Sequence, residues 1–260
     1  MIRSQTLERA RSGTRALDKA TFVGHVTNLI TPTNESGFPR PQSFLVEQRG
    51  HWTLPTHFHL QEQFQLIVGG SGRIGRHAIR GGSVHYASAH SGYGPLVSEE
   101  QGIAYLTLRR ISDTGAWYLP EQREHLIRTT KKRQRHAEPS SHLDADALRA
   151  LREPITEAVM PCDPSGLAVW LLQLPPHARI SAPVSPVPGG DRFYVLMQGG
   201  LRLQGDSLQG LATVFVSQED TIELEASSEG ATVMVLQFPG ESPASQYGLI
   251  QSNQSLGDIT

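Results

Sequence analysis

Two histidines separated by one residue carry the clearest chemical signal in the sequence. His57 and His59 lie in the stretch THFHLQEQF, which continues to Gln63. Side chains at positions i and i+2 of an extended strand point to the same side, so both imidazoles are expected to face one side while Phe58 faces the other. Two imidazoles and an oxygen from a neighbouring strand form a site for a first-row transition metal. Such a site leaves coordination positions open for substrate or dioxygen.

The elements around these histidines are predicted to be short β-strands. The chain has 260 residues, and its 25 Gly and 17 Pro separate short apolar runs. This punctuation is typical of an all-β protein with many turns. Apolar or alternating segments occur at 43–46, 63–68, 84–87 and 103–108. Their spacing predicts a sandwich or barrel of antiparallel strands.

The strand pattern occurs twice along the chain. The segment QFQLIVGGSGRIG, which starts at Gln63, aligns with RFYVLMQGGLRLQG, which starts at Arg192. The alignment pairs similar residues: Phe64 with Phe193, Leu66 with Val195, and Gly70 with Gly199. A repeat of roughly 130 residues that contains a full set of strands indicates two copies of one β domain. We therefore predict a duplicated barrel.

The histidine stretch resembles the first motif of the cupin superfamily. That motif is HxH, three or four further residues, an acidic residue, six residues and a glycine, and here the places are taken by His57, His59, Gln63 and Gly70. Glutamine stands where glutamate is expected, and the preceding glycine, Gly50, is displaced by one residue. The resemblance implies a bicupin: two tandem cupin-type double-stranded β-helix (jelly-roll) barrels joined by a partly helical linker, with a degenerate C-terminal barrel.

The second cupin motif would supply the fourth metal ligand. The stretch GSVHYASAHSGYGP, which starts at Gly82, is similar to this motif, but its ligand position falls on Tyr93 or Gly92 and not on histidine. His90 lies two or three residues early, and His85 is expected to face the barrel interior. The resemblance therefore leaves His90, with His85, Tyr93 or water as alternatives, as the fourth ligand.

The resemblance implies a metal-dependent enzyme that acts on a small organic substrate in the N-terminal barrel. A dioxygenase is the commonest chemistry of such a site, with His57 and His59 holding Fe²⁺, or alternatively Mn²⁺, Ni²⁺ or Zn²⁺. The neutral oxygen of Gln63 binds a divalent ion more weakly than a carboxylate, which favours an anionic substrate. No catalytic residue is assigned. The predicted substrate contacts are Tyr86, Tyr93 and Arg73.

Two other functions fit the same residues. A non-catalytic cupin would bind or sense a small molecule without turnover, and the missing acidic ligand and irregular second motif favour it. A metal-free isomerase or epimerase would use His57 or His59 as a general base. The metal content of the purified protein separates these functions from a metal-dependent enzyme.

The C-terminal copy lacks the histidines. The three ligand positions of the first motif correspond to Pro186, Pro188 and Arg192. We predict a metal-free C-terminal barrel that packs against the first barrel or completes a dimer-like interface within the chain. An alternative role for Arg192 is to hold an anion.

Charge and composition restrict the partners. The 23 Lys+Arg and 25 Asp+Glu give a formal net charge of −2, which argues against nucleic acid or an anionic membrane as the main partner. The single cysteine, Cys162, has no partner for an internal disulfide, and no signal peptide or membrane-spanning run is recognised. We expect a cytoplasmic protein with a small-molecule ligand, and a homodimer through exposed strand edges is a further prediction.

The predicted organisation has five parts. These are an N-terminal arm at 1–20, an N-terminal cupin barrel at 21–111, a polar and partly helical linker at 112–160, a degenerate C-terminal cupin barrel at 161–245 and a tail at 246–260. The helix in the linker is predicted around 145–151, after an acidic start at Asp144.

Overall fold

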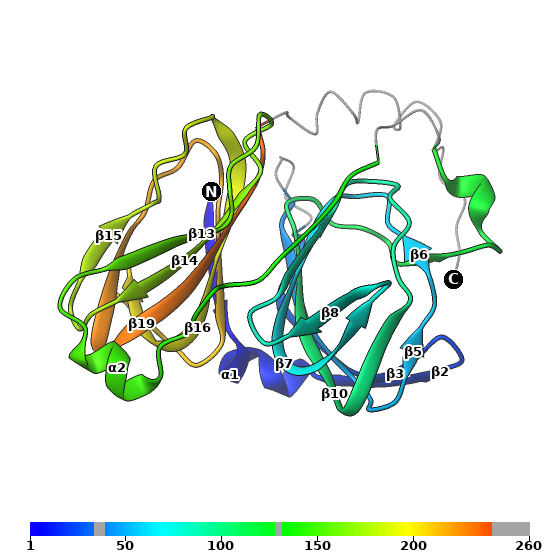
Figure 1. Cartoon of the computed structure of the whole chain (residues 1–260), viewed down its shortest axis with the longest axis horizontal. Coiled ribbons are helices and arrows are strands. Elements are labelled where there is room, and N and C mark those ends of the chain that lie inside the picture. The colour runs from blue at the N-terminus through cyan, green and yellow to red at the C-terminus, as the bar shows by residue number, and fades with distance from the viewer. Residues whose placement is uncertain (34–39, 128–131, 241–260) are drawn as a thin grey trace.

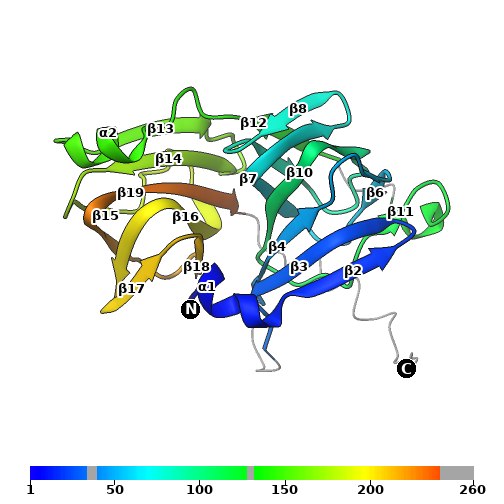
Figure 2. The ribbon, with the colours of Figure 1, turned by 90° about the horizontal axis from the view of Figure 1, so that it is seen from below.

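Two β-barrels lie side by side in the computed structural model, which describes residues 1–33, 40–127 and 132–240 (Figures 1 and 2). The all-β, two-barrel prediction is confirmed. The tail predicted at 246–260 lies outside the described residues. None of the described helices is long and apolar enough to cross a membrane.

The N-terminal barrel is formed by a sheet with nine described strands. They are β2 (Arg15–Lys19), β3 (Phe22–Ile30), β4 (Gln42–Gln48), β5 (Thr53–Leu54), β7 (Gln63–Ile74), β8 (His77–Arg80), β9 (Val84–Ala87), β10 (Leu96–Arg109) and β12 (Gln134–Ala137). The hydrogen-bonded order is β12-β9-β7-β10-β4-β3-β2, with β8 beside β7 and β5 beside β10. A separate pair of short strands, β6 (His57–Phe58) and β11 (Trp117–Tyr118), carries the first histidine of the HxH motif.

The C-terminal barrel repeats this arrangement with eight described strands. They are β1 (Ile2–Thr6), β13 (Ile155–Met160), β14 (Ala168–Leu174), β15 (Arg179–Ser181), β16 (Gly189–Leu203), β17 (Asp206–Gln209), β18 (Ala212–Val216) and β19 (Glu223–Pro239). The order β1-β18-β16-β19-β14-β13 matches β12-β9-β7-β10-β4-β3 strand for strand. The duplication read from the sequence therefore extends to the pairing of the strands.

Each barrel takes two strands from segments predicted to lie outside it, among them β2 of the predicted arm in the first barrel and β13 of the predicted linker in the second. β1, from the predicted arm, pairs with β18 of the C-terminal sheet and appears dark blue inside the left-hand barrel of Figure 1. β12, from the predicted linker, pairs with β9 of the N-terminal sheet. The arm and the linker are thus partly built into the two sheets.

Short helices fill the connections between strands. They are α1 (Leu7–Ala10), η1 (Arg11–Gly13), η2 (Arg123–His125) and α2 (Ala145–Ala150). The predicted linker helix is confirmed as α2, where the backbone N–H of Ala147 donates to the Asp144 carboxylate at 2.8 Å. A side-chain acceptor at this position satisfies a backbone N–H that the first turn leaves free.

Glycine is required at an irregularity in strand pairing that the two barrels share, within β7 and β16. Gly70 and Gly199 have φ of +69° and +77°, a region that favours glycine. A Cβ at either position would lie 2.1 Å from a backbone oxygen, that of Gly102 in the first barrel and of Gly230 in the second. The glycine of the first motif is thus explained by backbone geometry.

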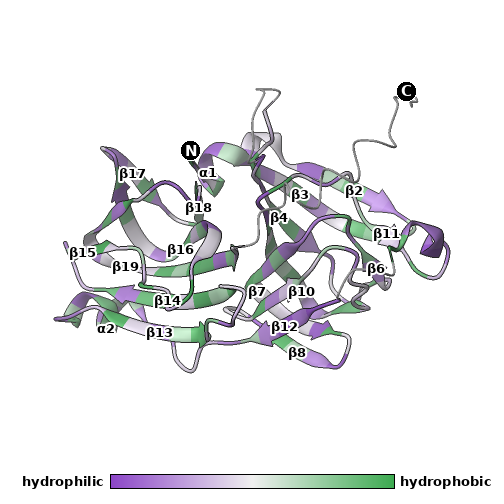
Figure 3. Cartoon of the chain, turned by 90° about the horizontal axis from the view of Figure 1, so that it is seen from above, coloured by the Kyte–Doolittle hydropathy of each residue, from purple (hydrophilic) through white to green (hydrophobic). Residues whose placement is uncertain are grey.

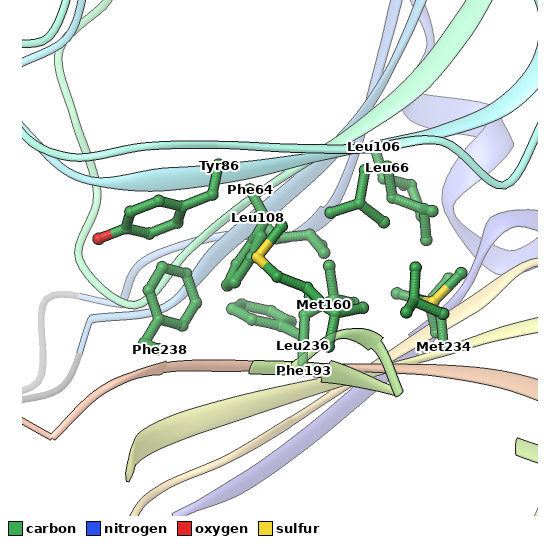
Figure 4. Close-up of a cluster of buried hydrophobic side chains, with 14 of the residues drawn as sticks. Phe64, Leu66, Tyr86, Leu106, Leu108, Met160, Phe193, Met234, Leu236 and Phe238 are labelled. Atoms are coloured by element: carbon green, nitrogen blue, oxygen red, sulfur yellow. The ribbon is translucent and has the colours of Figure 1, made fainter. Parts of the chain in front are cut away.

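Strand alternation divides β7 and β10 into two faces. Along 63–68 of β7 and 103–109 of β10, the even-numbered residues, including Phe64 and Leu108, point toward the C-terminal barrel and pack with Phe193, Leu236 and Phe238 in one buried cluster (Figure 4). The odd-numbered residues of these two stretches point into the N-terminal barrel. Figure 3 shows the resulting succession of hydrophobic and hydrophilic segments along the strands of this barrel. The C-terminal barrel therefore packs against the first barrel, as predicted.

Candidate functional site

Buried polar side chains converge inside the N-terminal barrel where β7 begins and β10 ends. We call this group the arginine–histidine cluster; it consists of Gln42, His57, His59, Gln63, Tyr93, Arg109 and Asp113. The residues drawn from β7 and β10 face inward because of the strand alternation, and Gln63 and Arg109 are 1% and 3% exposed. The structure thus brings together three of the four predicted metal ligands and one of the two alternatives.

His57 is held by a hydrogen bond from each ring nitrogen. Its Nδ1–H donates to the carbonyl oxygen of Pro55 at 2.7 Å, and its Nε2 accepts from the Tyr93 hydroxyl at 2.9 Å. Burial, and then the neighbouring His59, lower the pKa of His57 to about 3. The ring is therefore a neutral imidazole at neutral pH, and its Nε2 lone pair faces the cluster.

His59 is anchored by a carboxylate. Its Nδ1–H donates to Asp113 Oδ2 at 3.0 Å, and its ring centre lies 5.3 Å from that of His57. Burial, and then the charge of Arg109, lower the pKa of His59. Burial acts to raise the pKa of Asp113, but the hydrogen bond from His59 and the charges around it lower it. His59 is thus neutral beside an ionised aspartate.

Arg109 places a positive charge at the centre of the cluster. Its Nε and Nη2 donate to Gln63 Oε1 at 3.0 and 2.7 Å, and its Nη1 donates to Gln42 Oε1 at 2.9 Å. Its Nη2 also lies 3.0 Å from Nδ1 and 3.4 Å from Nε2 of His59. Burial lowers the pKa of Arg109. The acceptors of the guanidinium are therefore neutral side chains.

Tyr93 stands at the position that aligned with the fourth ligand. Its hydroxyl accepts from Gln63 Nε2 at 2.5 Å and donates to His57 Nε2. Burial raises the pKa of Tyr93, so the phenol is neutral. His85 also faces the interior as predicted: its Nδ1–H donates to Gln65 Oε1 at 2.9 Å, and its ring lies 4.8 Å from that of Tyr93.

The remaining predicted site residues lie elsewhere. The ring of His90 packs 6.0 Å from that of Phe58, and its backbone N–H donates to the His59 carbonyl oxygen. Tyr86 lies between the barrels (Figure 4) and donates to Glu62 Oε2 at 2.5 Å. Arg73 is exposed on β7. The contacts of these three side chains thus do not place them in the arginine–histidine cluster.

Arg109, Asp113 and Gln42 are the members that the sequence did not reveal. The one available signal is at the end of the apolar segment GIAYLTLRR, where Arg109 keeps the inward parity of Tyr105 and Thr107. A charged residue at an inward-facing position is unusual unless it has partners. That parity becomes informative only once the strand and its inner face are known.

The cluster has only some features of a metal site. Both imidazoles have Nδ1–H fixed by an oxygen acceptor, as metal-binding histidines commonly do. However, an ion held by His59 Nε2 and Gln63 Oε1 would lie beside the guanidinium of Arg109. At about 4 Å, the repulsion between a dication and this charge is roughly 8 kcal/mol at an effective dielectric constant of 20. In the described arrangement, the residues do not fit a divalent ion.

The side chains available as metal ligands also argue against a divalent ion at this site. Within 1–33, 40–127 and 132–240, no group of three or more His, Cys, Asp or Glu side chains is arranged to hold a metal ion. Asp113, the carboxylate of the cluster, already accepts from His59 and from the backbone N–H of Leu60 at 3.1 Å. Gln63 offers only a neutral amide oxygen, which already accepts from Arg109 and is a weak ligand for divalent ions.

Comparison with solved structures decides the fold. Nickel-bound bacterial pirin YhhW from Escherichia coli matches with a TM-score of 0.56 at 10% identity, over 92% of this chain and 99% of that chain. The fold is that of a bicupin. Oxalate decarboxylase OxdC of Bacillus subtilis matches this chain with a TM-score of 0.56 at 15% identity, over 99% and 84% of the two chains. A candidate dioxygenase from Nostoc punctiforme matches at 0.53 and 12%, over 93% and 80%.

Sequence comparison adds nothing to this result. No protein-family model matches the chain, and no curated protein sequence matches it. At identities of 10–15%, the structural likeness establishes the fold of the bicupin, and its function has to be argued from the cluster.

Proposed function

We propose that this bicupin binds a small organic acid in the N-terminal barrel, at the arginine–histidine cluster, without turnover. The observation that supports this function is the buried guanidinium of Arg109, whose hydrogen bonds go to the neutral oxygens of Gln42 and Gln63. A carboxylate in place of either amide would pair with the guanidinium in the bidentate geometry that this group favours.

The comparison of equivalent layers in the two barrels supports a ligand in the first barrel. One layer of the N-terminal barrel consists of Gln65, His85 and Thr107, and register pairs them across β7, β9 and β10. The same layer of the C-terminal barrel consists of Tyr194, Val214 and Val235. Buried polar groups lower stability unless they are hydrogen-bonded. Their concentration in one of two duplicated interiors favours a binding role there.

The neutral groups would recognise the rest of the ligand. Tyr93 offers a hydroxyl, and His85 Nε2 is a buried nitrogen without a hydrogen-bond partner among the described residues. A ligand with a hydroxyl or a second oxygen near its carboxylate would use such groups. His57, with a pKa of about 3, is a weak base, which does not favour the isomerase alternative.

Calorimetric titration tests this function. Acetate, pyruvate and benzoate are titrated into the protein at constant ionic strength, and acetamide and benzamide serve as uncharged controls. We expect at least one acid to bind saturably and its amide not to bind. Arg109→Met should abolish binding, Arg109→Lys should weaken it by about tenfold, and the exposed Arg73→Met should leave it unchanged.

Two outcomes would contradict the proposal. Binding that is equal for an acid and its amide would show that the charge is not recognised. Binding that survives Arg109→Met, in a variant that keeps the far-ultraviolet circular dichroism of the native protein, would place the acid elsewhere.

A metal-dependent enzyme, dioxygenase-like in its chemistry, is the second candidate for this site. The fixed Nδ1 groups of His57 and His59 favour it, and the structural neighbours include a nickel-bound pirin and an oxalate decarboxylase with Mn(II) centres. In this alternative Arg109 would have to leave its place beside Gln63. Oxygen uptake with the same acids, after anaerobic loading with Fe²⁺, tests it; uptake that His57→Ala abolishes would support the enzyme.

A further inference from the structure

An arginine–glutamine pair occupies the same register position in both barrels, with the two residues exchanged. Phe64 pairs with Leu108 in the first barrel, and Phe193 pairs with Leu236 in the second. One position further along each strand, Gln63 faces Arg109 and Arg192 faces Gln237. In both pairs the arginine Nε donates to the glutamine Oε1, at 3.0 Å in the first and 2.7 Å in the second.

Gln237 fixes the orientation of Arg192. Its side chain is fully buried, and its Nε2 donates to the carbonyl oxygen of Gly166 at 2.6 Å and to Ser185 Oγ at 3.0 Å. With the amide nitrogen committed in this way, Oε1 is turned toward Arg192. The guanidinium is therefore preorganised by a rigid neutral partner, which lowers the entropic cost of binding.

The charge of Arg192 is left without a carboxylate in the described part of the chain. Within residues 1–33, 40–127 and 132–240, no Asp or Glu forms an ion pair with it. The adjacent Asp191 belongs to the other face of β16 and accepts from the backbone N–H of Gln218 at 2.9 Å. Nε donates to Gln237, and the guanidinium also hydrogen-bonds the Tyr194 hydroxyl, which leaves its remaining N–H groups for another acceptor.

Arg192 also differs from Arg109 in its access to solvent. Arg192 is half-buried, whereas Arg109 is 3% exposed. Two half-buried side chains, Ser185 and Cys162, lie on the amide-nitrogen side of Gln237. They contact each other at 3.3 Å between Oγ and Sγ. The partial exposure of Arg192 itself gives a small ligand access to this guanidinium from solvent.

We propose that the C-terminal barrel carries a second binding site, at Arg192, for the carboxylate group of a small organic molecule. One guanidinium carries a single positive charge and presents parallel N–H groups that match a planar carboxylate. A phosphate dianion would need further cations for the same neutralisation. The site is separate from the arginine–histidine cluster and does not depend on the function proposed for it.

Fluorescence of Trp170 tests the site. Trp170 lies in the C-terminal barrel and, like Tyr194, is paired with Val235. Trp52→Phe and Trp117→Phe leave Trp170 as the reporter, and Arg109→Met removes the first site. Acetate or inorganic phosphate then replaces chloride stepwise at constant ionic strength, and the fluorescence of Trp170 is recorded.

We expect a saturable change with acetate and at least tenfold weaker binding of phosphate. Adding Arg192→Met should abolish the acetate response, and Arg192→Lys should weaken it severalfold. The matched control is Arg202→Met, an exposed arginine of the same strand, which should leave the response unchanged.

Three results would overturn the proposal. The first is a fluorescence change that grows linearly with acetate concentration. The second is an acetate response of unchanged affinity in both Arg192→Lys and Arg192→Met, and the third is tighter binding of phosphate than of acetate. Circular dichroism of each variant shows whether the barrel is folded. Because the first site is already removed, failure here leaves the function proposed for the N-terminal barrel untouched.

Discussion

The neutral state of His57 predicts how the stability of the protein depends on pH. Its pKa falls from 6.5 to about 3 on folding. Between these values the unfolded chain binds a proton at His57 and the folded chain does not, so the free energy of unfolding falls as the pH falls from 6.5 toward 3. At 1.36 kcal/mol per unit, the loss is about 2 kcal/mol at pH 5 and about 4 kcal/mol at pH 3, where the folded His57 is itself half protonated.

Urea unfolding at pH 7 and pH 5 measures this effect. His57→Gln keeps a donor and an acceptor at the site but removes the titration, so it should lose about 2 kcal/mol less than the native protein between the two pH values. Contributions from the other histidines and the carboxylates are common to both proteins and cancel in the difference. The exposed His125→Gln is the control and should follow the native protein. Equal losses in the native protein and His57→Gln would refute the reasoning.

Three further substitutions test the packing, each by urea or thermal unfolding. Tyr93→Phe removes the hydroxyl between His57 Nε2 and Gln63 Nε2. Because two buried nitrogens are then left unpaired, the free energy of unfolding should fall by about 2–4 kcal/mol. A loss below about 0.5 kcal/mol would contradict the hydrogen bonds described for the cluster. Gly70→Ala forces a Cβ against a backbone oxygen 2.1 Å away and should lower the free energy of unfolding by about 3 kcal/mol or more. Native stability of this variant would contradict the close backbone approach at Gly70. Phe238→Ala removes a ring from the interface between the barrels and should cost about 3–5 kcal/mol, whereas an unchanged midpoint would contradict the packing in Figure 4.

The duplicated strands were predictable because they depend on local patterns. Alternating apolar residues, followed by a glycine with positive φ, recur at Gly70 and Gly199, and each stretch specifies its own strand. The inward direction of His85 follows from the same alternation. These features need no knowledge of how distant segments pair.

The centre of the site was harder to predict because it depends on non-local pairing. Arg109 belongs to the cluster because the end of β10 lies against the start of β7, and no local pattern near His59 contains that information. Asp113 reaches His59 from a connection 54 residues away in sequence. Similarly, β1 pairs with β18 across almost the whole chain. The motif singled out His57 and His59, which lie in the cluster, but gave no sign that an arginine would lie among them.

Metal content after deliberate loading tests the central claim most directly. The claim is that the guanidinium of Arg109 lies where an ion bound by His59 and Gln63 would be its neighbour, so that charge repulsion disfavours metal binding. The native protein is incubated with Ni²⁺, desalted and analysed for nickel, with His57→Ala as the matched control. We predict a stoichiometry far below one ion per chain that His57→Ala leaves unchanged. About one nickel ion per chain, lost in His57→Ala, would contradict the claim.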